Sequence, residues 1–197
     1  MYRLIGSLRN RAFRVAWLLE ELGEVYELVE AQPHSETVLS VDPGGKLPVL
    51  ETDDGALWDS IAIMNWLADR HGRFTHPASS FARAQQNAVT GQILDEIESL
   101  LWMAGRHSFI LPEDRRVPEI KDSLRWEFTR NCKRIAMRLR DGPFLAGDAP
   151  TVPDFLWTHC ATWAHSARFD VNEPRLINLA ERMRARQAYA KVAKLRG

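Results

Sequence analysis

The sequence has few cysteines and no excess of charge of either sign. Its 197 residues include two cysteines, Cys132 and Cys160, which lie far apart and form no CxxC pair. This spacing disfavours a disulfide framework and a cysteine-rich zinc site, and it fits a reducing compartment. Lysine and arginine total 26, and aspartate and glutamate also total 26. The chain therefore lacks the positive excess on which non-specific nucleic-acid binding depends.

Long apolar runs are also missing from the chain. No window holds the ~18 apolar residues that a membrane-spanning helix needs, and residues 1–15 contain no apolar core of a secretory signal. The composition, with 45% hydrophobic and 26% charged residues, is that of an ordinary globular protein. A chain of this length buries roughly 70% of its unfolded surface, so its core needs neither a disulfide nor a metal. We expect a soluble, cytoplasmic protein with no membrane or nucleic-acid partner.

Short β-rich runs alternate with helical patterns in the first part of the chain. Apolar residues recur at helical spacing in two segments, which end at Gly23 and Gly72. The turn sequence Asp53-Asp54-Gly55 lies between two β-rich runs and predicts a β-hairpin. The predicted order is therefore β-α-β-loop-β-β-α, with elements at residues 2–6, 12–22, 25–29, 48–52, 56–58 and 60–72.

Only helical patterns follow Phe81, and prolines interrupt them. A polar stretch around Pro77 separates these patterns from the first part of the chain. Helices are expected near residues 82–106, 118–140, from 151 onward, 174–184 and 187–195. The predicted fold class is α+β, with a sheet-containing domain at 1–72, a linker at 73–81 and an all-α helical bundle at 82–197.

Two segments of the first part are suited to present backbone groups to a ligand. Leu47-Pro48 follows two glycines at the start of a strand. Either this bond is cis in a tight turn, which would turn the Leu47 N–H and C=O toward a ligand, or Pro48 is a trans residue that opens an edge strand. Asp59 is a good N-cap. The free N–H groups after it, with the Ser60 hydroxyl, either form a carboxylate or phosphate site or simply cap the helix.

A third segment has a structural explanation only. Thr151 and Asp154 have the spacing of a helix-capping box, and Pro153 is tolerated in the first turn of the helix. We therefore expect a buried helix start at this point, without a catalytic role. The neighbouring pair His159 and Cys160 lacks the spacing of zinc ligands, and no metal is expected.

In combination, these segments resemble one protein family. GGKLPVL, the Asp-Ser helix start and FLAGDAPTVPDF follow one another in the order typical of glutathione transferases, and the C-terminal AYAKVAKLRG is similar to that family's last helix. The resemblance implies a thioredoxin-like first domain with a mixed four-stranded sheet. It also implies an all-α domain that shapes an electrophile pocket, glutathione as co-substrate without a metal, and a homodimer.

The resemblance also assigns residues to a glutathione site. The Leu47 backbone would pair with the cysteinyl part of glutathione, in the manner of an added β-strand. Ser60 would bind the α-carboxylate of the γ-glutamyl end, and Lys46 would bind the glycyl carboxylate as a point charge. The complete set of expected glutathione contacts is His34, Lys46, Leu47, Pro48, Asp59 and Ser60.

Three residues are candidates for stabilising the glutathione thiolate. A thiol with the model cysteine pKa of about 8.5 is mostly protonated at pH 7, so stabilising its thiolate favours catalysis. The family uses a Tyr, Ser or Cys just after the first strand, and in this chain that position falls on Arg9. Ser7, the only hydroxyl of this loop, is the first choice, followed by Asn10 and then Arg9. Alternatively, backbone N–H groups alone hold the sulfur.

The second substrate and the function follow from the same resemblance. The pocket for the electrophile is expected at the end of the first long helix of the all-α domain, where aromatic and Met residues suit an apolar site. The alternative is that these residues, which recur at helical spacing, simply belong to the core. The residues of the pocket would be Trp102, Met103, Arg106, His107 and Phe109. The expected function is conjugation of the glutathione thiolate to small hydrophobic electrophiles, in detoxification. The alternative is a glutathione-binding or protein-interaction module with the same fold and little or no transferase activity.

Overall fold

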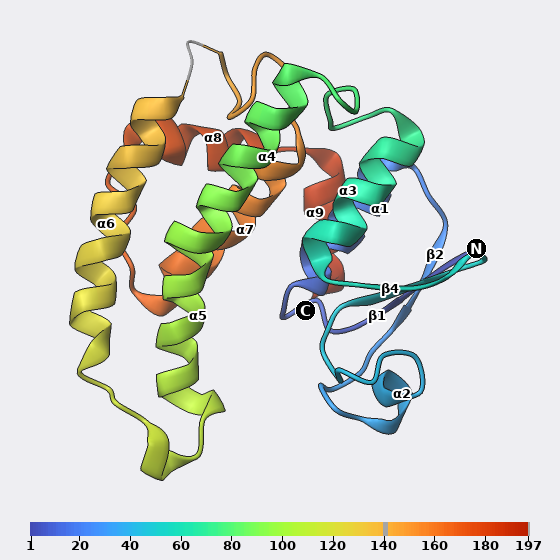
Figure 1. Cartoon of the computed structure of the whole chain (residues 1–197), viewed down its shortest axis with the longest axis horizontal. Coiled ribbons are helices and arrows are strands. Elements are labelled where there is room, and N and C mark those ends of the chain that lie inside the picture. The colour runs from blue at the N-terminus through green and yellow to red at the C-terminus, as the bar shows by residue number, and fades with distance from the viewer. Residues whose placement is uncertain (140–141, 197) are drawn as a thin grey trace. The chain divides into compact units, whose positions relative to one another are not determined.

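The computed structural model describes residues 1–139 and 142–196, and the chain forms two compact units (Figure 1). The first unit comprises Met1–Ala78 together with Arg184–Gly197, and the second comprises Ser79–Met183. The domain bounds expected from the sequence stay a prediction. The structure adds one feature that the sequence division lacked, because the C-terminal segment groups with the N-terminal unit.

The first unit contains a mixed four-stranded sheet, as predicted. Its strands are β1 (Tyr2–Ile5), β2 (Tyr26–Val29), β3 (Val49–Thr52) and β4 (Gly55–Trp58). β1 pairs in parallel with β2 and antiparallel with β3, and β3 pairs antiparallel with β4. The strand order is therefore β2-β1-β3-β4, and the predicted α+β class with a thioredoxin-like first part is confirmed.

The strand register brings distant segments to the same end of the sheet. Ile5 is paired with both Val29 and Val49, and Val49 is also paired with Trp58. These four residues define one end of the sheet, which we call the loop end. The segments that follow β1, β2 and β4, and the segment that precedes β3, therefore meet there. Tyr2 and the β3–β4 turn lie at the opposite end, which we call the hairpin end.

The helices of the first unit are α1 (Ala12–Leu22), α2 (Glu36–Leu39), α3 (Ser60–His71) and α9 (Gln187–Leu195), and α1 packs against α3 and α9 (Figure 1). Tyr189 of α9 places its ring edge-on against Phe13 and Trp17, with centroids 5.2 and 5.0 Å away. Glu21 of α1 accepts two hydrogen bonds from Arg186, at 2.5 and 2.7 Å. These contacts hold the C-terminal helix to the first unit. The short α2 falls where the sequence predicted a loop, since one helical turn is too short to show periodicity.

The described residues of the second unit form helices joined by loops. They are α4 (Phe81–Ile93), η1 (Leu94–Glu98), α5 (Ser99–Gly105), η2 (Arg106–Ile110), η3 (Glu113–Arg115), α6 (Ile120–Arg138), α7 (Val152–Ala167) and α8 (Pro174–Arg184). The helix expected at 82–106 is thus interrupted by π-helical turns, which apolar spacing does not reveal. The end of the helix expected at 118–140 lies outside the described residues. Across those residues, no helix is both long enough and apolar enough to traverse a bilayer.

Helix α7 begins with the predicted capping box. The buried Asp154 carboxylate accepts hydrogen bonds from the Leu145 N–H at 2.8 Å, the Thr151 N–H at 2.7 Å and the Thr151 hydroxyl at 3.0 Å. Burial raises the pKa of Asp154 to about 6, and the three donors oppose that rise. The prediction of a buried helix start is confirmed.

Candidate functional site

The loop after β1 is held close to the start of α1 and to Pro48. Gly6 has φ 154°, and a Cβ atom added there would lie 2.8 Å from Ala12 Cβ and 3.6 Å from Pro48 Cβ. A larger residue would therefore push these segments apart. Glycine at position 6 lets the β1–α1 loop and the Pro48 turn meet at the loop end of the sheet.

Within this loop, the predicted thiolate residues use their side-chain oxygens to shape the backbone. The Ser7 Oγ accepts a hydrogen bond from the Arg9 N–H at 3.3 Å, and the Asn10 Oδ1 accepts one from the Ala12 N–H at 2.9 Å. The Asn10 N–H donates to the Ser7 carbonyl at 3.0 Å. Among the described residues, the Ser7 hydroxyl proton and the Asn10 side-chain N–H groups have no acceptor. Both remain able to donate to a bound ligand.

The Leu47–Pro48 peptide bond is cis, so the cis alternative is confirmed. Leu47 packs its side chain against the apolar cluster of Ile5, Ala31, Val38 and Val49. Its backbone lies just before the β3 ladder, which begins at Val49. Across residues 1–139 and 142–196, neither the N–H nor the C=O of Leu47 has a hydrogen-bond partner. An extended peptide could therefore use both groups.

The segment before the cis bond brings His34 and Lys46 close to each other. The Asp42 carboxylate is buried and accepts hydrogen bonds from the Gly44 N–H at 3.2 Å and the Lys46 N–H at 3.3 Å. The His34 N–H donates to the Gly45 carbonyl at 2.9 Å. The His34 ring lies against Gly45, where an added Cβ would be 2.2 Å from Nδ1. The loop thus places the exposed His34 against Gly45, the residue that precedes the exposed Lys46.

Asp59 and Ser60 perform different tasks at the start of α3. The Asp59 carboxylate accepts hydrogen bonds from the N–H groups of Ile61 at 2.9 Å and Ala62 at 3.0 Å, so it caps the helix. Ser60 is buried, and its Oγ accepts hydrogen bonds from Arg14 Nε at 3.1 Å and Nη2 at 2.6 Å. Two guanidinium N–H groups thus point at this oxygen. The hydroxyl proton is left to donate to a ligand.

Sequence reasoning missed two residues of this site, Arg14 and Asp42. Arg14 is 1% exposed and lies among the buried Phe13, Val15 and Ala16 of α1. An arginine within an apolar helical pattern was an available signal, because buried arginines normally pair with polar groups. Asp42 was signalled by the Asp-Pro-Gly-Gly sequence, since an aspartate side chain commonly bonds to the backbone two residues further on.

The residues expected in the electrophile pocket belong to the second unit. Trp102 and Met103 lie on α5, and Arg106 begins the π-helical turn η2; all three are half-buried. His107 Nδ1 accepts a hydrogen bond from the Val117 N–H at 3.0 Å, and Phe109 is exposed. Their role in a pocket for a second substrate stays a prediction.

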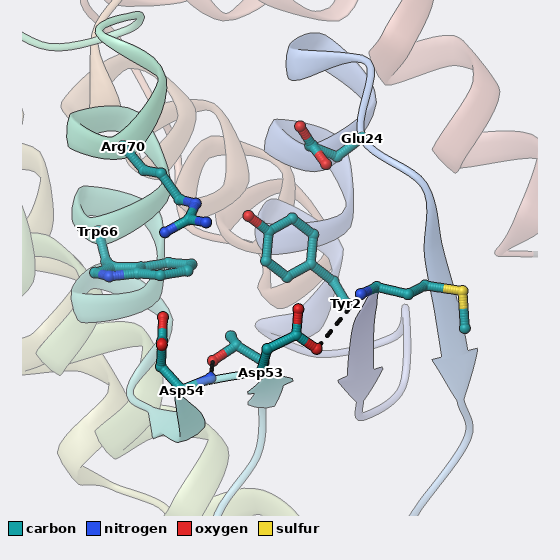
Figure 2. Close-up of a pocket in the computed structure, with 8 residues that line it drawn as sticks. Tyr2, Glu24, Asp53, Asp54, Trp66 and Arg70 are labelled. Carbon is teal, nitrogen blue, oxygen red and sulfur yellow. Dashed lines mark hydrogen bonds and ion pairs between the residues drawn. The ribbon is translucent and has the colours of Figure 1, made fainter.

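A hollow of about 200 Å³ lies at the hairpin end of the sheet, away from the candidate site (Figure 2). The Tyr2 ring lies edge-on to Trp66 at 6.1 Å, and the Arg70 guanidinium lies over Trp66 at 5.2 Å. Burial, with the charge of Glu24, raises the pKa of Tyr2. Glu24, Asp53 and Asp54 supply carboxylates to the remaining wall. None of the residues predicted to bind glutathione lines this hollow.

The first unit matches a known family model. Residues 10–70 match the model of the glutathione S-transferase N-terminal domain. A glutathione S-transferase of Pseudomonas putida is 28% identical over 124 residues, which are 60% of this chain and 54% of that protein. The crystal structure of a glutathione S-transferase from Pseudomonas fluorescens superposes with a TM-score of 0.81 at 25% identity, covering 95% of this chain and 96% of that one. The first unit is therefore similar to the N-terminal domain of glutathione S-transferases, and the chain as a whole is similar to glutathione transferases.

A second relative of this chain has a different name. Hematopoietic prostaglandin D synthase of Gallus gallus is 26% identical over 155 residues, which are 75% of this chain and 71% of that protein. Relatives at this level of identity therefore carry more than one name. The predicted resemblance to glutathione transferases is confirmed, whereas the choice of substrate depends on the residues of the site.

Proposed function

We propose that this protein binds glutathione at the loop end of the sheet and transfers its thiolate to small hydrophobic electrophiles. The observation that carries the proposal is the Leu47 backbone, which has no hydrogen-bond partner among the described residues and directly precedes β3. The neighbouring strand β4 leads into the buried Ser60 hydroxyl. A peptide with a free α-carboxylate satisfies both features together. Its backbone forms strand-like hydrogen bonds with Leu47, and its carboxylate accepts the Ser60 proton.

Buried Arg14 supports the carboxylate end of this proposed site. Its guanidinium donates to the Ser60 oxygen, so the Ser60 proton remains available for the ligand. The positive charge behind Ser60 also favours an anion in front of it. At the other end of the tripeptide, Lys46 and His34 would bind the glycyl carboxylate. Asp59 and Pro48 contribute by shaping the helix start and the turn.

The proposed chemistry requires a glutathione thiolate. Ser7 donates its hydroxyl proton and Asn10 its amide N–H to the sulfur, with the Arg9 guanidinium as the third candidate. The start of α1 adds the favourable field of a helix N-terminus. The sulfur then forms a bond to the electrophilic carbon, while the leaving group departs with the electron pair of its former bond. The residues Trp102 and Arg106 of the second unit would hold the electrophile.

A second candidate function is glutathione binding without transfer. Arg9 occupies the position where the family carries a Tyr, Ser or Cys, and the Ser7 and Asn10 oxygens already bond within the loop. Such a protein would bind glutathione through Leu47 and Ser60 but leave the thiol unactivated.

We also propose that the protein acts in detoxification as a cytoplasmic homodimer. Trp58 of β4 is 62% exposed and Phe81 of α4 is 79% exposed, and a partner subunit would cover such apolar side chains. Equilibrium sedimentation tests the homodimer, and a protein that is monomeric at all concentrations would contradict it.

A titration of the bound thiol separates the two functions. The ultraviolet absorbance of the thiolate is followed against pH in the complex, with binding first established by calorimetry. A transferase lowers the thiol pKa below that of free glutathione, and Ser7→Ala raises it again by about 1 unit, equivalent to about 1.4 kcal/mol. Asn10→Asp is a second variant that keeps the acceptor for the Ala12 N–H. It replaces the donor by a negative charge, and both changes should raise the thiol pKa. A bound thiol that titrates like free glutathione favours the binding module, and absent glutathione binding excludes both.

A further inference from the structure

Arg9 is a cation at the loop end of the sheet, and its side chain has no partner among residues 1–139 and 142–196. Its backbone N–H bonds to the Ser7 Oγ, whereas its side chain is exposed and makes no hydrogen bond or ion pair with any described residue. Residues 1–19 contain Arg3, Arg9, Arg11 and Arg14 but no acidic residue. No carboxylate of that segment can therefore neutralise Arg9.

The acidic residues at the same end of the sheet also leave Arg9 without a partner. The carboxylates of Asp42 and Asp59 each accept two backbone hydrogen bonds and thereby shape their own loops. Glu30, which follows β2, is exposed and forms no ion pair with Arg9. A guanidinium fork thus remains available beside the residues proposed to hold the glutathione sulfur.

The position of Arg9 limits what reaches that sulfur. Arg9 lies between Ser7 and Asn10 in a loop whose backbone is held by hydrogen bonds of 3.3 and 3.0 Å. An electrophile that bonds to a sulfur held by Ser7 and Asn10 must lie within reach of the Arg9 side chain. A wholly apolar molecule that covers this guanidinium takes it out of water without compensation. A carboxylate instead offers it two parallel charge-assisted hydrogen bonds.

We propose that Arg9 selects electrophiles that carry a carboxylate near the reacting carbon. This inference rests on the proposed transferase function and narrows its substrate class from hydrophobic electrophiles to small aromatic or unsaturated acids. Arg9 then acts as a specificity-determining residue, while Ser7 and Asn10 stabilise the thiolate. If Arg9 instead served the thiolate, its removal would slow every electrophile equally.

A matched pair of substrates distinguishes these roles. In 4-chloro-3-nitrobenzoate and 4-chloro-3-nitrobenzamide, the glutathione sulfur bonds to the ring carbon that carries chlorine. Chloride leaves with the electron pair of the C–Cl bond, and the thiol proton passes to the solvent. Each enzymatic kcat/KM is divided by the uncatalysed rate constant for the same compound, which removes the difference in intrinsic reactivity. The quotient for the benzoate divided by the quotient for the benzamide is the carboxylate preference.

We expect Arg9→Gln to lower the carboxylate preference by up to about fivefold, the upper end of the range for an exposed ion pair. Arg9→Lys should retain most of it, and Arg9→Glu should reverse it. High salt should weaken the preference of the parent protein, since an exposed pair is screened. Arg70→Gln is the matched control, because it removes an exposed arginine at the hairpin end of the sheet. An equal loss for both substrates in Arg9→Gln, or no change, overturns the proposal.

Binding of the two product conjugates provides a measurement that is independent of turnover. Calorimetry with the parent protein should give tighter binding of the carboxylated glutathione conjugate than of the carboxamide conjugate, and Arg9→Gln should remove the difference. Equal affinities of the parent for the two conjugates refute the role of Arg9. If the parent protein turns over 4-chloro-3-nitrobenzamide and shows no carboxylate preference, the inference about Arg9 fails and the transferase function stands. If glutathione binds and neither compound reacts, the transferase function fails, and the inference, which rests on it, fails with it.

Discussion

Two buried polar centres of this protein differ in how their hydrogen-bonding capacity is used. Asp154 in the second unit accepts from two backbone N–H groups and one hydroxyl, all within the segment 145–154. Ser60 in the first unit accepts from the Arg14 guanidinium and still has a proton to donate. A centre that is satisfied within the protein stabilises the fold, whereas a centre with a remaining donor is prepared for a ligand.

The largest effect on stability is expected from Asp154→Ala. The change removes a helix cap and leaves the buried N–H groups of Leu145 and Thr151 without their acceptor. We expect a loss of roughly 3 kcal/mol in the free energy of unfolding, measured by urea denaturation. Asp148→Ala, at an exposed carboxylate in the preceding loop, is the control. Glutathione affinity per folded molecule should not change, and a loss of affinity would break the division between the two centres.

The pH dependence of stability tests the same carboxylate. The pKa of Asp154 in the folded protein, about 6, is raised above the model value of 3.8. The folded state therefore holds the proton more tightly, and its stabilising contribution is fully present below about pH 4. This contribution is lost as the pH rises through 6, by roughly 3 kcal/mol in total. The free energy of unfolding of the parent, relative to that of Asp154→Asn, should therefore fall as the pH rises from 4 to 7. A difference between the two proteins that stays constant over this range would contradict the raised pKa of Asp154.

For the ligand-binding centre, Arg14→Met should weaken glutathione binding by about 2 kcal/mol, or roughly thirtyfold. The buried positive charge behind Ser60 is lost, while methionine fills much of the same space. Calorimetry gives the affinity, and a urea titration of the same variant corrects for any unfolded fraction. Arg70→Met should leave the affinity unchanged, because Arg70 lies at the hairpin end. An equal effect of the two variants would show that only net charge matters.

The smallest expected effect is that of Ser60→Ala, which should weaken glutathione binding by about 1.5 kcal/mol, or roughly tenfold. One hydrogen bond to a charged carboxylate is lost, and the Arg14 charge remains. Asp95→Ala, at an exposed residue of η1, serves as the comparison and should have the smaller effect. A Ser60→Ala protein with parental affinity would show that the hydroxyl does not meet the ligand.

Much of the fold could be predicted because its signals are local. The Asp53-Asp54-Gly55 turn specifies the β3–β4 hairpin, and Gly23 and Gly72, both with positive φ, end α1 and α3. The capping box at Thr151 and Asp154 is equally local. The segments α2 and the π-helical turns η1 and η2 could not be predicted, since one turn of helix is shorter than the window that periodicity requires.

The candidate site was predictable only as separate pieces. The sequence indicated that Leu47, Ser60 and Ser7 had suitable chemistry, and the family resemblance placed them in one site. It did not indicate that Arg14 donates to Ser60, because the two residues are 46 positions apart and meet only through packing of α1 against α3. The use of the Asn10 oxygen as a cap, which leaves its amide N–H groups as donors, also came from the structure.

The sequence by itself determined where strands, turns and helix ends lie, because these depend on backbone preferences of neighbouring residues. Tertiary structure decided which of these pieces face one another, since the strand register aligns Ile5, Val49 and Trp58 at one end of the sheet. It also decided which polar groups are satisfied internally. Asp154 has its donors within its own segment, whereas Leu47 and Ser60 keep hydrogen-bonding groups that no residue of the described part of the chain uses.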